Sequence, residues 1–122
     1  DLATGVWAEV EPAGATSTPK RAFSAFAYHA GERSMLLFGG RDDSGLHNDT
    51  LAIDLASLVW ARLGDDDPRG IERPLPRAET GLVHLADDRF AIFGGETLTE
   101  LVADVWEFDT GTRVWKALAP GP

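Results

Sequence analysis

The sequence MLLFGG at residues 35–40 recurs, with its apolar character kept, as FAIFGG at residues 90–95, which is 55 residues later. The spacing after each glycine pair is the same: nine residues lead to an aspartate, five more to a second aspartate and six more to a tryptophan. These residues are Asp49, Asp54 and Trp60 in the first copy and Asp104, Asp109 and Trp115 in the second. Self-similarity at a fixed period marks a repeat architecture, so the chain is predicted to contain two copies of one structural unit.

The segments between turn signals are short and rich in aromatic and β-branched residues, which favours an all-β fold. Each unit is predicted to have four strands, and a four-stranded unit with a period of about 50 residues is typical of a propeller blade. The predicted strands are 23–29, 34–38, 50–54 and 58–63 in the first unit and 80–85, 90–93, 105–109 and 113–118 in the second.

The apolar strand with its glycine pair, the two aspartates and the tryptophan resemble the kelch motif. The resemblance covers two repeats, 19–63 and 76–118, joined by an inter-blade loop at 64–75 and followed by a tail at 119–122. Residues 5–10 read like the last strand of a third copy, so residues 1–18 are predicted to be the last strand of a preceding blade and a linker. The expected fold is therefore a kelch-type β-propeller with two four-stranded antiparallel blades plus one extra N-terminal strand.

The repeated residues have predicted structural roles. Glycine tolerates unusual backbone angles and close approach, so Gly39-Gly40 and Gly94-Gly95 are expected to receive the indoles of Trp60 and Trp115. The four aspartates of the motif are expected to accept hydrogen bonds from backbone N–H groups in turns.

Two blades are fewer than the roughly 4 to 8 that close a propeller. An isolated pair would expose a broad apolar face on each terminal blade. We therefore expect further blades as partners, supplied either by the same longer chain or by other copies in a homo-oligomer.

The charge balance and the residue types present limit the function. Eleven Lys and Arg against 20 Asp and Glu give a formal net charge of -9, which disfavours binding to nucleic acid and to anionic membrane surfaces. There is no cysteine, which excludes disulfides and thiolate zinc sites. No common enzyme motif occurs, so the chain is predicted to be non-catalytic and to use no cofactor.

The resemblance implies that the loops after the second and fourth strands of each blade lie on one face and carry binding functions. Here these loops are 41–48, 64–75 and 96–103, and they are mostly acidic, which would suit a basic peptide segment or a sugar, although polar loops are also simply solvated. The candidate partner-binding residues are Arg41, Asp42, Asp43, His47, Asp65, Asp66, Asp67, Arg69, Arg73 and Glu96. A protein partner is the favoured interpretation.

An alternative places a carbohydrate-binding or sugar-modifying site at the central channel, built from several blades. Its candidates are Arg21 and Arg77 at the two blade entries, and His29 and His84, each ten residues before the first glycine of its pair. Repetition at the period of the fold favours structural roles for these residues, such as an ion pair for each arginine.

A calcium site at Asp65-Asp66-Asp67 is not predicted. The three carboxylates are contiguous rather than alternating, and Pro68 follows at once, so the pattern does not match an EF-hand loop. No other metal site is predicted.

Overall fold

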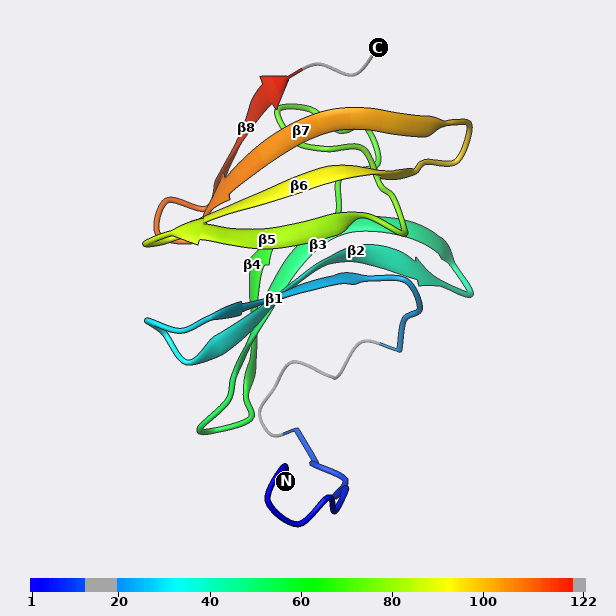
Figure 1. Cartoon of the computed structure of the whole chain (residues 1–122). Helices are drawn as coiled ribbons and strands as arrows, with labels where there is room; N and C mark the ends of the chain where they lie inside the picture. The colour runs from blue at the N-terminus through cyan, green and yellow to red at the C-terminus, as the bar shows by residue number, and fades with distance from the viewer. Residues whose placement is uncertain (13–19, 120–122) are drawn as a thin grey trace.

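The computed structural model describes residues 1–12 and 20–119 (Figure 1). The described residues form eight strands. Among these residues there is no helix that is long and apolar enough to span a membrane. The strands are β1 (Ala25–His29), β2 (Ser34–Asp42), β3 (Gly45–Asp54), β4 (Trp60–Gly64), β5 (Gly81–Ala86), β6 (Arg89–Glu96), β7 (Leu101–Asp109) and β8 (Val114–Ala119). They pair in sequence order into two antiparallel sheets, β1–β4 (blade 1) and β5–β8 (blade 2). The predicted all-β fold with two four-stranded blades is confirmed.

Both glycine pairs lie inside a strand rather than at its end. β2 continues past the first pair to Asp42, and β6 continues past the second pair to Glu96. The register shifts at each pair, so each pair forms a β-bulge. The predicted strand ends at residues 38 and 93 are therefore wrong, because the ladder resumes after the bulge. β3 and β7 likewise begin earlier than predicted, at Gly45 and Leu101.

The first glycine pair is needed because the backbone that enters blade 2 passes beside it. Gly39 has a φ of 62°, and a side chain there would collide with the carbonyl oxygen of Arg77. The amide of Gly40 donates a 2.9 Å hydrogen bond to the same carbonyl. The predicted contact between the glycine pairs and the tryptophans is wrong, since the atoms nearest to these glycines are backbone atoms and hydroxyl-bearing side chains.

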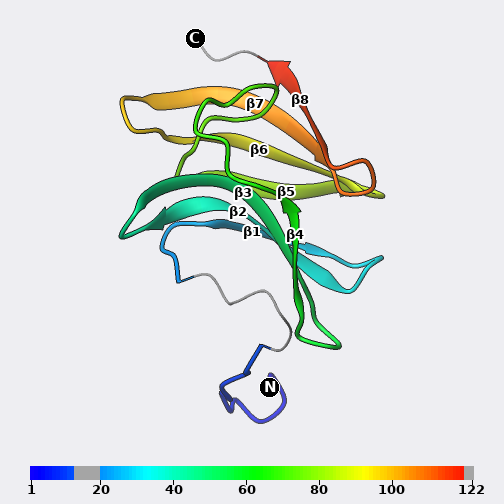
Figure 2. The ribbon, with the colours of Figure 1, turned by 180° about the vertical axis from the view of Figure 1, so that it is seen from behind.

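The main hydrophobic core lies between the two blades, which stack as layers (Figures 1 and 2). Trp115 of β8 contacts Phe38 of blade 1, with 5.0 Å between ring centroids, and Phe108 of its own blade, with 4.8 Å. Trp115 therefore joins the two blades. The buried residues of this core are Leu36, Phe38, Phe90, Ile92, Phe108 and Trp115.

The two faces of a blade have different roles. Trp60 holds in blade 1 the position of Trp115, and it packs in a separate cluster with Leu37 and Leu51, on the opposite side of the sheet from Leu36 and Phe38. Phe93 holds in blade 2 the position of Phe38, yet Phe93 is 60% exposed and Phe38 only 1%. Blade 2 covers the face of blade 1 that contains Phe38. The equivalent face of blade 2, which contains Phe93, is not covered by any residue that the structure describes.

The predicted ninth strand is not formed among the described residues. Residues 5–10 pair with no strand, and Trp7 is 97% exposed. A strand needs a neighbour for its backbone hydrogen bonds, and both blades already have their four strands. That this segment completes a preceding blade stays a prediction. Residues 13–18 of the predicted linker and 120–122 of the predicted tail lie outside the described residues.

Replacing Trp115 with alanine should lower the free energy of unfolding by about 3 to 5 kcal/mol, because it removes a large side chain from the core between the blades. Chemical denaturation followed by circular dichroism measures this. Trp7→Ala is the control and should change the stability by less than about 0.5 kcal/mol, as exposed substitutions usually do. A loss below about 1 kcal/mol for Trp115→Ala would show that the blades do not depend on this contact.

Candidate functional site

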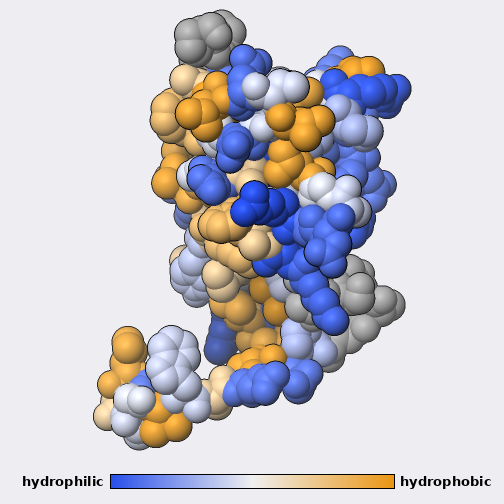
Figure 3. Space-filling model, turned by 90° about the vertical axis from the view of Figure 1, so that its right-hand side faces the viewer, coloured by the Kyte–Doolittle hydropathy of each residue, from blue (hydrophilic) through white to orange (hydrophobic). Residues whose placement is uncertain are grey.

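Two of the predicted binding loops, 41–48 and 96–103, lie at one end of the molecule, on the right in Figure 1. The inter-blade loop meets them at Pro68 and Leu75, while its residues 71–73 lie beside Trp106 and Arg113 of blade 2. We call the surface of residues 41–48, 64–75 and 96–103 the loop face. Figure 3 looks onto this end and shows hydrophobic patches among hydrophilic ones. Arg41 and Asp42 lie at the end of β2 and His47 lies in β3, so these predicted loop residues stand on strands.

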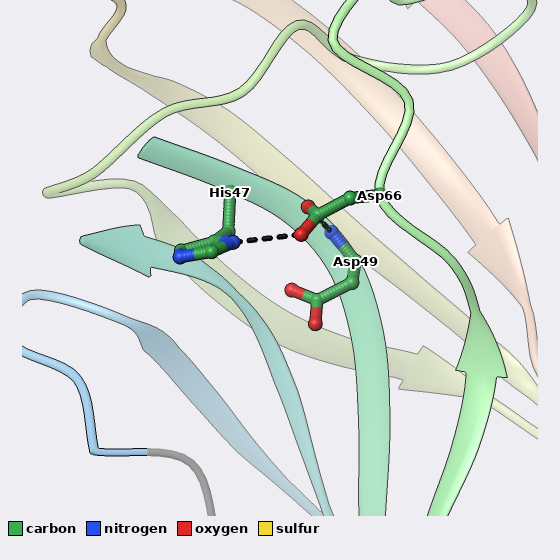
Figure 4. Close-up of side chains that lie close together, drawn as sticks. All are labelled: His47, Asp49 and Asp66. Carbon is green, nitrogen blue, oxygen red and sulfur yellow. Dashed lines mark hydrogen bonds and ion pairs between the residues drawn. The ribbon is translucent and has the colours of Figure 1, made fainter. Parts of the chain in front are cut away.

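Asp66 fastens the inter-blade loop to blade 1. Its Oδ1 accepts hydrogen bonds from the backbone amides of Asn48 (2.8 Å) and Asp49 (3.1 Å) in β3. Its Oδ2 lies 2.7 Å from Nδ1 of His47, as Figure 4 shows. One carboxylate therefore binds three groups of the same strand, which fixes the start of the loop over β3.

His47 lies between two carboxylates. Its Nδ1 is 2.7 Å from Oδ2 of Asp66, and its Nε2 is 2.9 Å from Oδ2 of Asp42. Both ring nitrogens can donate only in the imidazolium form. Burial by itself would lower the pKa of His47, but the hydrogen bonds to Asp66 and Asp42 outweigh it and raise the pKa above the ordinary 6.5. Hydrogen bonds from Ser44 and His47 lower the pKa of Asp42.

Asp49 is fully buried and is neutralised by two arginines. Arg21 hydrogen-bonds to both of its carboxylate oxygens, and Nη1 of Arg62 lies 2.8 Å from Oδ2. Burial would raise the pKa of Asp49, but the hydrogen bonds from Arg21 and Arg62 outweigh this effect and lower the pKa. The carboxylate is therefore held ionised inside the blade.

The same pair recurs in blade 2. Arg77 is 1% exposed, and it hydrogen-bonds to both carboxylate oxygens of Asp104 and to the carbonyl of Gly94. Nε1 of Trp106 donates a further 2.8 Å hydrogen bond to Asp104. Arg21 and Arg77 thus form structural ion pairs, as their repetition suggested.

The expectation for the motif aspartates holds at one end of the third strand only. Asp54 accepts hydrogen bonds from the amides of Ala56 and Ser57, and Asp109 does the same for the turn that follows it. The same prediction is wrong for Asp49 and Asp104. Their carboxylates bind arginine side chains and not the backbone amides of turns.

Oxygen and nitrogen atoms of His47, Asp49 and Asp66 lie within 4.8 Å of one another, which is close enough for a metal site (Figure 4). The charges of this cluster are already matched: Asp49 is bound by two guanidinium groups, and Asp66 by the imidazole and two amides. A hard cation needs free carboxylate oxygens. The donor set therefore fits an ion-pair network and not a metal centre.

The two histidines predicted as channel candidates meet each other between the blades. The ring centroids of His29 and His84 are 4.9 Å apart, and both rings pack on Phe90. Nε2 of His84 lies 2.8 Å from the carbonyl of Asp87, and Nε2 of His29 lies 3.7 Å from a carboxylate oxygen of Asp88. They lie at the end of the blades opposite to the loop face, and a structural role for them stays a prediction.

The remaining candidates on the loop face divide into two groups. In the first, the Arg41 guanidinium lies 4.6 Å from the ring centroid of Phe23, and Arg69 pairs with Asp67 at 2.9 Å. Arg73 donates a 2.6 Å hydrogen bond to the carbonyl of Asp65. In the second group, the side chains of Asp43, Asp65 and Glu96 are exposed.

Asn48 is a site residue that sequence reasoning missed. It is buried, and its Nδ2 donates to the carbonyls of Asp67 (2.7 Å) and Pro74 (2.8 Å), while its Oδ1 accepts from the amide of Asp67. Asn48 thereby holds two points of the inter-blade loop. Arg62, which neutralises Asp49, was missed as well, because neither residue repeats in the second copy.

The raised pKa of His47 has a measurable consequence. Its ion pairs stabilise the fold below the pKa of the unfolded state, and this stabilisation is lost as the pH rises through the higher pKa of the folded state. We expect an NMR titration to give His47 a pKa above 6.5. In the His47→Gln variant, the free energy of unfolding should fall less as the pH rises from the unfolded-state pKa to the folded-state pKa of His47. A pKa below 6.5 would contradict the imidazolium assignment.

Removing one partner of the buried pair in blade 2 should be costly. Arg77→Leu leaves Asp104 without its cation, and we expect a loss of about 3 to 5 kcal/mol in unfolding free energy. Arg89→Leu is the control, because the Arg89–Glu107 pair is half exposed and 3.6 Å long, and it should cost less than about 1 kcal/mol. Equal losses for the two variants would refute the structural role of Arg77.

Comparison with known proteins agrees with this architecture. The KLHDC2/KLHL20/DRC7 Kelch-repeats domain matches residues 1–121 of the chain. The chain is also 29% identical over 119 residues to "Acyl-CoA-binding domain-containing protein 4" of Arabidopsis thaliana. That match covers 98% of this chain but only 17% of the plant protein. The two stacked blades and the extent of the family match together show that this chain belongs to the kelch-repeat family.

Proposed function

We propose that this chain is part of a non-catalytic kelch propeller that binds a protein partner through its loop face. Kelch-repeat domains commonly serve as protein-interaction modules, which supports a protein partner in general. Parts of three loops from the two blades meet around one hollow, which supports the choice of this face.

The observation that carries the proposal is the difference between the buried charged residues, which form ion pairs with each other, and the exposed carboxylates of the loop face. The buried charged residues Arg21, Asp49, Arg77 and Asp104 hold each other in place. On the loop face, the exposed carboxylates of Asp43, Glu96 and Glu100 form no ion pair with any residue that the structure describes. Such groups remain accessible to a partner.

A channel site for sugars is less well supported. Arg21 and Arg77 would have to release their aspartates to bind a ligand, and breaking a buried pair is costly. His29 and His84 pack against each other and against Phe90. The proposal therefore assigns these four residues to the structure of the blades.

Selection of random peptides displayed on phage against the chain tests the proposal. We expect peptides whose affinity falls about ten-fold or more in the loop-face variant Glu100→Lys, because charge reversal beside the bound segment repels it or removes an attraction. Glu32→Lys is the matched control, since Glu32 is an exposed glutamate in the turn between β1 and β2 at the opposite end. Failure to enrich any peptide, or equal effects of the two variants, would contradict the proposal.

A further inference from the structure

A hollow of about 410 Å³ opens on the loop face between the two blades. Its walls come from the turn between β2 and β3, the turn between β6 and β7, and the inter-blade loop, so neither blade forms it alone. The apolar residues that line it are Leu46, Pro68, Leu75, Pro76 and Leu98.

Leu98 stands at the mouth of this hollow and is 90% exposed. Its turn is closed by the amide and the hydroxyl of Thr97, which both donate 2.9 Å hydrogen bonds to the carbonyl of Glu100. Leu75, on the inter-blade loop, is also exposed. Two leucines from different loops thus present apolar surface that a bound side chain would remove from water.

The walls of the hollow are anchored before any partner arrives. Asn48 holds the carbonyls of Asp67 and Pro74, which lie next to the lining residues Pro68 and Leu75. A site that is already formed loses little conformational entropy on binding, which favours a short segment as its ligand.

The rim of the hollow is acidic. Asp43 precedes the lining residue Ser44, and Glu96 and Glu100 flank the lining segment 97–99. The three loops together contain eight carboxylates against three arginines and one histidine. Each of these cations already has a contact: Arg69 pairs with Asp67, Arg73 binds a carbonyl oxygen and His47 lies between two carboxylates. The fourth, Arg41, lies over the ring of Phe23.

We propose that this hollow binds an aliphatic side chain of a partner segment in which Lys or Arg flanks that side chain. The aliphatic group fills the space between Leu46, Leu75 and Leu98, and the flanking cations meet Asp43, Glu96 and Glu100. This inference rests on the proposed function of the loop face and adds the chemistry of the segment that it recognises.

Fluorescence anisotropy with a labelled peptide of sequence Gly-Arg-Lys-Leu-Lys-Arg-Gly tests the inference. We expect the peptide to bind, and we expect binding to weaken about ten-fold when its leucine is replaced by serine, because burial of the leucine is lost. A peptide with glutamate in place of its four basic residues should not bind. Raising the salt concentration should weaken but not abolish the difference between the leucine and serine peptides.

Two protein variants locate the binding. Leu98→Ser should weaken binding of the leucine peptide about ten-fold. Leu85→Ser is the matched control and should not, since Leu85 is an exposed leucine near the opposite end of blade 2. Circular dichroism confirms that both variants remain folded.

Several results would overturn the inference. They are no binding of the leucine peptide at millimolar concentration, equal binding of the leucine and serine peptides, and equal losses in Leu98→Ser and Leu85→Ser. Phage-selected peptides that depend on Glu100 but contain no aliphatic residue beside basic ones would overturn this inference alone, and leave the proposed function of the loop face intact.

Discussion

The packing of Trp115 and Phe108 against Phe38 supports the rest of the structure. Each four-stranded sheet has two apolar faces, and a single sheet cannot bury both. When blade 2 covers one face of blade 1, it also brings the backbone of Arg77 beside the glycine bulge of β2. The loop face depends on this contact as well, because its hollow has walls from both blades.

Charged residues complete what the apolar core begins. Arg21 with Asp49, and Arg77 with Asp104, tie the segment before each blade to its third strand. In blade 1 a second layer of ion pairs, from Asp42 through His47 to Asp66, continues outward to the inter-blade loop. The backbone amide of Asp49 donates to Asp66, so the buried Arg21–Asp49 pair and the ion pairs at the loop face are connected by hydrogen bonds.

The repeat in the sequence is enough to predict the strands, their grouping into two blades and the turns capped by Asp54 and Asp109, because these features are local. It does not predict what the glycines and the first aspartates contact. Gly39 meets a backbone from the next blade, and Asp49 meets Arg62 across β3 and β4, and such partners depend on packing between distant segments. Asn48 and Leu98 have no counterpart in the other copy, so the repeat contains no signal for them.

The contrast between the covered Phe38 and the uncovered Phe93 gives the stack a direction. Blade 1 carries Trp60 on one side and receives Trp115 of blade 2 on the other, so the contact between these two blades is heterologous rather than isologous. Adding a blade to such a stack covers one acceptor side and creates another of the same kind. The last uncovered face is buried only if the blades are related by a rotation that brings the last blade against the first. Heterologous contacts of this kind therefore favour a closed ring of blades.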